Sequence, residues 1–145
     1  MGLTFSVAVV TVEGPVFNGP ADFVQAPGAD GDLGILAHHI PLLTPLRLGE
    51  LLIRLEDDET YLFLAGGFLA VLPGRVVVLA DVVERAEAID VERAAEARRR
   101  ATEALAQGQP SRETAEALER ALLRLKVADI ARNRRSKPRR PHPLQ

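Results

Sequence analysis

Between Phe5 and Ala80 the apolar residues come in short runs, and glycine or proline separates one run from the next. Several runs alternate with polar positions or are rich in β-branched residues, as half-buried strands are. The runs occupy residues 5–12, 23–25, 51–55, 60–65, 68–72 and 75–80. Short strands with turn signals between them predict an all-β sandwich or barrel, which we place at residues 1–86.

The pattern changes from Ala88 onward, where Ala, Glu, Arg and Leu dominate. These residues are the strongest helix formers. Asp90 is placed to cap a first helix, Gly108 to end it, and Ser111 to cap a second. The short joint between the two predicts an antiparallel helical hairpin over residues 87–133.

Each predicted helix has one apolar face, and small residues on the first allow the second to approach closely. The positions are Ala94, Ala97, Ala101, Ala104 and Leu105 on the first helix, and Leu118, Ala121, Leu122, Leu125 and Ala128 on the second. The joined apolar surface is thin, and a lone hairpin of this size is marginally stable. We therefore expect the hairpin to dock on the β half or on a partner, as a movable element.

Composition narrows the class of protein. Apolar residues make up 47% of the 145 positions, enough for a packed core, and the absence of Trp makes that core aliphatic. The absence of cysteine excludes disulfides, thiolate metal sites and cysteine nucleophiles. No apolar run approaches the roughly 18 residues that span a bilayer, and the first residues lack the pattern of a secretory signal.

Charge is distributed unevenly along the chain. The net charge is −2, and the six basic residues from Arg132 onward, with no acid among them, leave −8 on residues 1–131. A sequence-independent DNA binder would more usually show a basic body, so we expect no nucleic-acid partner. Residues 134–145 are rich in Pro, Arg and Lys without periodicity, which predicts a disordered basic tail.

Residues 31–46 most invite a chemical interpretation, because His38 and His39 are adjacent in an otherwise apolar segment. Neighbouring residues on a strand point to opposite faces, so the two histidines cannot easily share one metal ion. His142 lies in the tail and offers no third ligand. We interpret the pair as turn and strand-entry residues, and we predict neither a metal site nor a catalytic residue.

Four arginines of the predicted hairpin offer another possibility. Arg93 and Arg100 share a face of the first helix, and Arg120 and Arg124 share a face of the second. In a folded hairpin these guanidiniums could converge on one polyanion, and arginine suits phosphate better than lysine does. Considered alone, such faces are more typical of solvated helices whose arginines pair with glutamate.

Several motifs then follow one another along most of the chain. They are Val9-Val10-Thr11 with Gly14, Val16-Phe17 and Gly19; Gly31-Asp32-Leu33-Gly34-Ile35-Leu36; Pro41-Leu42-Leu43-Thr44; Ala65-Gly66-Gly67-Phe68; and Val78-Leu79-Ala80-Asp81. In these motifs and their order the chain resembles the ε subunit of bacterial F-type ATP synthase, called δ in mitochondria, over about residues 3–131. The resemblance implies a flattened ten-stranded β-sandwich followed by a two-helix hairpin.

The resemblance also implies a non-catalytic rotor subunit, peripheral to the cytoplasmic face of the bacterial cell membrane. In such proteins the sandwich binds the γ subunit and rests on the ring of c subunits, which helps couple proton flow to ATP synthesis. The hairpin blocks ATP hydrolysis when it extends towards the α and β subunits. The turn Asp30-Gly31-Asp32 corresponds to the loop that meets the c ring. The alternative is a non-catalytic protein-binding β-sandwich module unrelated to the synthase.

Some bacterial relatives bind ATP in the folded hairpin through a motif of the form Ile/Leu-Asp-x-x-Arg-Ala. Here Ile89, Asp90, Arg93 and Ala94 match the motif, and Glu84, Arg100, Arg120 and Arg124 match the accompanying positions. The resemblance therefore implies ATP as a regulatory ligand, with no cofactor required. A ligand that binds only the folded hairpin stabilises it against the extended form.

Overall fold

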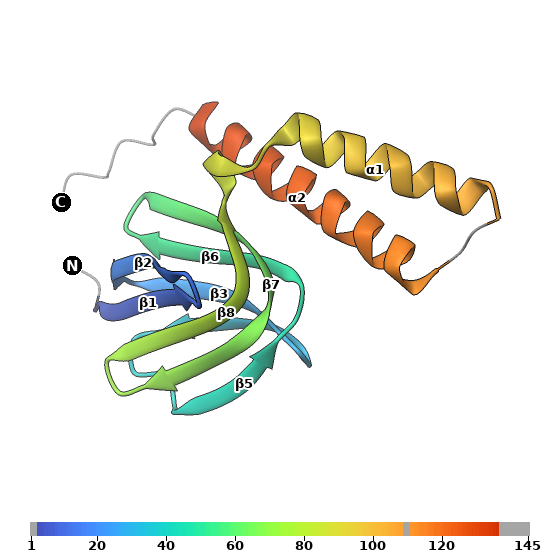
Figure 1. Ribbon diagram of the computed structural model, residues 1–145. Coiled ribbons are helices and arrows are strands. Elements are labelled where there is room, and N and C mark those ends of the chain that lie inside the picture. The colour runs from blue at the N-terminus through green and yellow to red at the C-terminus, as the bar shows by residue number, and fades with distance from the viewer. Residues whose placement is uncertain (1–2, 109–110, 137–145) are drawn as a thin grey trace.

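The computed structural model describes residues 3–108 and 111–136. The strands are β1 (Phe5–Thr11), β2 (Gly14–Ala21), β3 (Phe23–Gly28), β4 (Gly31–Leu36), β5 (Leu42–Leu46), β6 (Gly49–Leu55), β7 (Asp58–Leu72) and β8 (Arg75–Arg85). A 3₁₀ helix, η1 (Ala86–Ala88), leads to α1 (Val91–Ala106) and α2 (Arg112–Ser136). The predicted β-sandwich followed by an antiparallel helical hairpin is confirmed (Figure 1).

The long strand β7 belongs to both layers of the sandwich. Its first half pairs with β6 and its second half with β5, while β8 pairs with it along most of its length. Gly66 and Gly67 lie at the changeover with φ of +72° and +131°. A Cβ at Gly67 would lie 2.2 Å from the carbonyl oxygen of Leu79. Because only glycine accepts both this φ and this contact, the glycine pair lets β7 turn from one layer into the other.

The strand count differs from the ten strands that the resemblance implies. The described residues form eight, because the runs at 60–65 and 68–72 are one continuous strand and β8 likewise continues to Arg85. One strand is unexpected: β2 includes two Gly-Pro pairs that are interpreted as turns from the sequence. This strand ends the strand order and pairs with β1. An edge strand tolerates proline, since part of its hydrogen-bonding capacity is not used in the ladder.

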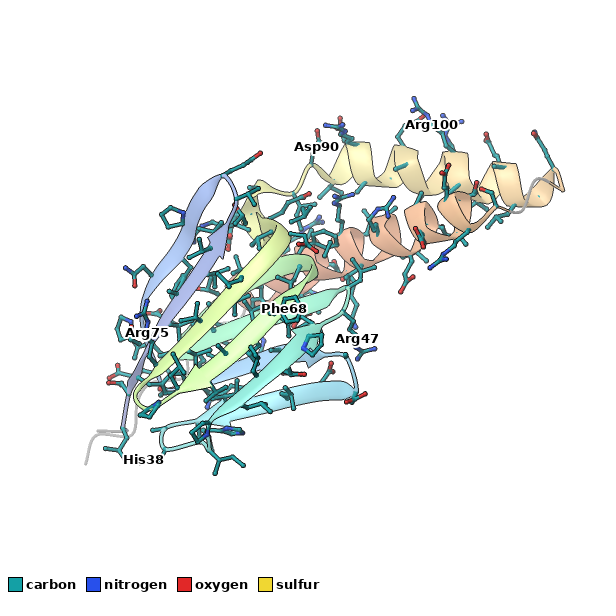
Figure 2. All side chains as sticks on the ribbon, turned by 60° about the horizontal axis from the view of Figure 1, so that its bottom comes forward. His38, Arg47, Phe68, Arg75, Asp90 and Arg100 are labelled. Carbon is teal, nitrogen blue, oxygen red and sulfur yellow. The ribbon has the colours of Figure 1, made fainter. Side chains whose placement is uncertain are left out.

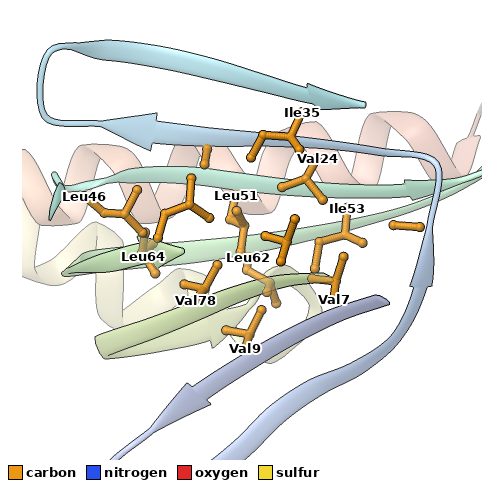
Figure 3. Packing of buried hydrophobic residues seen from close by; sticks show 14 of the residues in the cluster. Val7, Val9, Val24, Ile35, Leu46, Leu51, Ile53, Leu62, Leu64 and Val78 are labelled. Atoms are coloured by element: carbon orange, nitrogen blue, oxygen red, sulfur yellow. The ribbon is translucent and has the colours of Figure 1, made fainter. Parts of the chain in front are cut away.

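The sandwich core is aliphatic, as the composition predicts. Figure 3 shows valine, leucine and isoleucine side chains from both layers meeting between the strands. The members with no exposed surface are Val7, Val9, Ala21, Val24, Ala26, Leu51, Leu62, Leu64, Leu69 and Val78. No polar side chain is buried in the described residues. Burial of apolar surface, rather than polar pairing, therefore holds the two layers together.

The helix ends follow the predicted caps. The backbone N–H of Arg93 donates to Asp90 Oδ1 at 3.0 Å, and that of Thr114 donates to Ser111 Oγ at 3.0 Å. Gly108 takes a φ of +72° just after α1. The predicted end of the second helix is three residues short, since α2 continues to Ser136 before the proline-containing segment begins. The rest of the predicted tail, residues 137–145, lies outside the described residues.

The hairpin rests on the sandwich through α2, and α1 lies on the far side of α2 (Figure 1). A second apolar cluster forms this joint, with Tyr61, Phe63, Ala86 and Ile89 on one side and Val127, Ala128 and Ala131 on the other. The predicted face of α2 is wrong at Leu122, which is 44% exposed. Its neighbour Leu123 packs against the cluster instead, because α2 has to face both α1 and the sandwich. No described helix is long and apolar enough to cross a membrane.

Candidate functional sites on the sandwich and the hairpin

The outer face of β5, β7 and β8 exposes two neighbouring rows of apolar residues. The strand register places Leu43, Ala70 and Val77 in one row, and Pro45, Phe68 and Leu79 in the next. Leu43 is 73% exposed, Phe68 52% and Leu79 57%. Figure 2 shows Phe68 on the sheet, and Phe68 is not part of the apolar cluster beneath α2. A contiguous exposed apolar surface of this kind is typical of a protein–protein contact. We refer to it as the apolar sheet face.

The predicted ring-facing turn joins β3 to β4 at the surface. Asp30 and Asp32 are both exposed, and between them Gly31 takes a φ of +138°. Asp32 pairs with Arg47 at 3.0 Å. Asp30 has no ion-pair partner among the described residues. The turn therefore presents one unpaired carboxylate to the surroundings.

Of the eight residues predicted to bind ATP, the structure joins Glu84 and Arg124 directly. Glu84 lies on β8, and its Oε1 is 2.9 Å from Arg124 Nη2 and 3.1 Å from Nε. The guanidinium carbon of Arg124 also lies 4.7 Å from the ring centroid of Phe63. Both charged side chains are about one-third exposed. Arg124 is therefore held by the sandwich, and most of its side chain is shielded from solvent.

The other predicted ATP-binding residues surround the start of α1 or lie further along the hairpin. Ile89 and Ala94 are buried, and Asp90 caps α1 through the backbone N–H of Arg93. Arg100 is different, because it pairs with Glu96 on the exposed side of α1 (Figure 2). The predicted convergence of four arginines is thus not formed in this conformation, since Arg100 and Arg124 are engaged by carboxylates of different elements.

Arg120 on α2 is half-buried and forms no ion pair among the described residues. It lies one helical turn before Arg124, so the two guanidiniums belong to the same side of the helix. Of the two, only Arg124 is joined to the sandwich.

The two histidines belong to the turn between β4 and β5, in keeping with the turn interpretation. His38 has a φ of +65°, and His39 Nδ1 lies 2.7 Å from the carbonyl oxygen of Ile40. Both line a hollow of about 250 Å³ at the end of the sandwich, together with Arg75. In the described part of the chain, no group of three or more His, Asp or Glu side chains could hold a metal ion.

A charged hollow of about 260 Å³ lies between α2 and the strands β3 and β6. Glu50 and Lys126 line it from opposite sides, and the Asp32–Arg47 pair lies at its margin. Burial raises the pKa of Glu50, and Lys126 opposes that change by favouring the charged carboxylate. The stability of the joint between hairpin and sandwich therefore depends on the charges of Glu50 and Lys126.

Tyr61 and Glu59 of the sandwich lie near the C-terminal end of α2. Burial, and then the hydrogen bond that its hydroxyl donates to Glu59, raise the pKa of Tyr61 to about 12. Glu59 also pairs with Arg134 of α2 at 3.4 Å. Tyr61 is therefore a neutral donor at physiological pH, and it links the sandwich to the last turns of the helix.

Two of these features, the apolar sheet face and the contact between Phe63 and Arg124, could not be predicted from the sequence. The apolar sheet face reads as ordinary strand hydrophobicity, and only the register shows that Phe68 and Leu79 are outside the core. The Phe63–Arg124 contact joins residues far apart in the chain. The alternation of polar and apolar residues in β7 was a usable signal for the first feature, but its phase changes at Gly66 and Gly67.

An all-β body with an exposed apolar face, joined to a helical hairpin through one helix, is typical of a protein-binding subunit of a larger assembly. The model of the beta-sandwich domain of ATP synthase delta/epsilon chains matches residues 4–86. The chain belongs to this family, whose members are non-catalytic central-stalk subunits of ATP synthase, with the catalytic sites on the β subunits. The alternative of a binding module unrelated to the synthase is therefore wrong.

Individual relatives support the assignment over most of the chain. An ATP synthase epsilon chain of Dehalococcoides mccartyi is 48% identical over 128 residues, covering 86% of this chain and 91% of that one. One from Shouchella clausii is 42% identical over 126 residues, covering 86% and 95%. A chain in the mitochondrial ATP synthase structure of Euglena gracilis (OSCP/F1/c-ring, rotational state 1) has a TM-score of 0.65 at 19% identity, covering 88% and 78%. That last likeness shows a shared fold.

Proposed function

We propose that the chain binds the γ subunit through the apolar sheet face and so helps to couple proton flow to ATP synthesis. The observation that carries this proposal is the pair of exposed apolar rows across β5, β7 and β8, which a lone subunit would leave in water. An apolar surface centred on an aromatic residue is the usual anchor of a protein interface.

Capture of the γ subunit by the purified chain tests the proposal. Phe68→Asp places a charge in the middle of the apolar sheet face and is expected to weaken capture by at least about tenfold. Leu122→Asp alters a comparably exposed residue on α2 and serves as the control. Equal capture by both variants would show that γ binds elsewhere.

The turn Asp30-Gly31-Asp32 is our proposed contact with the c ring, at the cytoplasmic face of the bacterial membrane, where the subunit is peripheral. Exposure of the turn and the unpaired carboxylate of Asp30 support this. The chain has no cysteine, so Asp30→Cys introduces a unique cross-linking site. Cross-links to c subunits are expected from this position in the assembled enzyme, and not from Gln107→Cys at the end of α1.

The hairpin is the proposed inhibitor of ATP hydrolysis, acting when it leaves the sandwich and extends to the α and β subunits. Its attachment through one helix and an alanine-containing cluster supports a movable element. Ending the chain after Ala88 removes both helices and is expected to raise ATP hydrolysis by the assembled enzyme while γ is still bound. An unchanged rate at full γ occupancy would contradict inhibition.

ATP is the proposed regulatory ligand of the docked hairpin, with Glu84, Ile89, Asp90, Arg93, Ala94, Arg100, Arg120 and Arg124 as the binding residues. The guanidiniums of Arg93 and Arg120, which form no ion pair among the described residues, support an anion site. NMR titration of the isolated chain with ATP tests this. Shifts at these residues are expected, Arg93→Ala should weaken them and Arg99→Ala should not. Silence at millimolar ATP would exclude the site.

A further inference from the structure

Arg124 of α2 contacts two side chains of the sandwich, Glu84 and Phe63. Its guanidinium pairs with Glu84 through two nitrogens and lies over the ring of Phe63, which is itself fully buried. A carboxylate on one side and an aromatic face on the other fix the guanidinium in two directions.

The apolar part of the same joint is modest. From α2 it takes Val127, Ala128 and Ala131, with Leu123 and Ile130 only partly buried. An alanine methyl removes little apolar surface from water compared with a leucine side chain. The joint is thus weak enough for a single strong polar contact to decide how much of the time it is closed.

We propose that Arg124 is the docking anchor of the hairpin: Phe63 and Glu84 together form a receptor on the sandwich for this one guanidinium. At the end of α2, Glu59 forms a second and more exposed contact: it pairs with Arg134 and accepts a hydrogen bond from Tyr61. Because phosphate would have to draw Arg124 away from Glu84, the anchor also sets how strongly any anion can compete for it.

The anchor is a property of the isolated chain. It deepens the proposed regulation by the hairpin, yet its test needs neither the synthase nor ATP, so either proposal can fail while the other stands.

The sandwich contains a matched control with the same chemistry. Arg54 pairs with Asp22 at 3.3 Å, and its guanidinium carbon lies 4.7 Å from the ring centroid of Phe23. All three residues belong to the sandwich, and none takes part in the apolar joint. Removing this arginine should therefore leave docking unchanged.

The experiment measures how often the joint opens. Ala131→Cys places the only thiol of the chain in the joint, where Ala131 is 7% exposed, so a thiol reagent reacts with it only after undocking. In this background Arg124→Gln is expected to raise the labelling rate by about tenfold, the effect of losing a partly buried cation–π contact and its ion pair. Arg54→Gln should leave the rate unchanged.

Further variants separate the parts of the anchor. Arg124→Lys keeps the charge but loses the planar stack, and should give an intermediate rate. Glu84→Gln should raise the rate, and adding it to Arg124→Gln should have little further effect, because the two act through one contact. An unchanged rate in Arg124→Gln, or an equal rise in Arg54→Gln, would overturn the proposal.

Discussion

The sandwich core and the joint beneath α2 use the same kind of interaction at very different strength. The core draws large aliphatic residues from both layers and contains no polar side chain among the described residues. The joint combines alanines and one valine of α2 with two aromatic rings, and it is bordered by ion pairs at both ends. The first arrangement fixes the shape of the sandwich, whereas the second joins the hairpin to it through fewer and smaller apolar side chains.

This difference also matches the two proposed roles of the chain. If the apolar sheet face binds γ as proposed, it has to stay rigid, because the strand register sets which side chains the partner meets. The proposed regulatory role requires the hairpin to leave its docked position, and low-stability contacts are the ones that open. The contrast leads to four predictions, from the largest effect to the smallest.

Gly67→Ala should damage the fold most. The added Cβ would meet the carbonyl oxygen of Leu79 at 2.2 Å in a left-handed conformation, and strain with overpacking should cost about 4 kcal/mol. Urea unfolding followed by circular dichroism measures the loss. Gly74→Ala is the control, since Gly74 also has a positive φ but nothing within 4 Å of the added methyl, and it should cost only about 1 kcal/mol. Equal losses would show that the contact with β8 is unimportant.

Leu64→Ala should lower the free energy of unfolding by about 3 kcal/mol, because it leaves a cavity in the fully buried core. The loss should appear as a lower urea midpoint for the whole sandwich. Leu43→Ala on the apolar sheet face should change the midpoint by less than about 0.5 kcal/mol, since Leu43 is exposed. A large loss at Leu43 would mean that the exposed rows serve stability and not binding.

Val127→Ala should cost about 2 kcal/mol at most, and the effect should be confined to the joint, where Val127 is fully buried. Hydrogen exchange should quicken in α2 and stay unchanged in β1, β3 and β8. A uniform rise across the sandwich would show that hairpin and sandwich unfold as one unit.

Glu50→Gln should have the smallest effect and a characteristic pH dependence. Burial raises the pKa of Glu50 in the folded protein, so the folded state binds this proton more tightly than the unfolded state does. Stability from this group is present below the unfolded pKa and is lost as the pH rises through the folded value. At pH 7 the glutamine variant should be more stable than the parent by up to about 0.5 kcal/mol, and the two should converge below about pH 4. A variant less stable at pH 7 would assign the dominant role to the Lys126 attraction.

Much of the architecture can be predicted from local patterns. The caps at Asp90 and Ser111 and the end of α1 before Gly108 are each encoded within four residues of where they act. The strand count and the path of β7 are harder, because a proline-containing edge strand and a strand that changes layers both break the local rules. The candidate ATP residues come from the family motif, and their positions relative to one another depend on how α2 docks.

The sequence by itself determined a β body, a capped helical hairpin, an aliphatic core and membership of a family, since each follows from local propensity, periodicity or ordered motifs. The tertiary structure decided which apolar residues stay outside the core, that α2 and not α1 meets the sandwich, and that Arg124 lies between Glu84 and Phe63. These outcomes depend on strand register and helix rotation, which are fixed only when distant segments pack against each other.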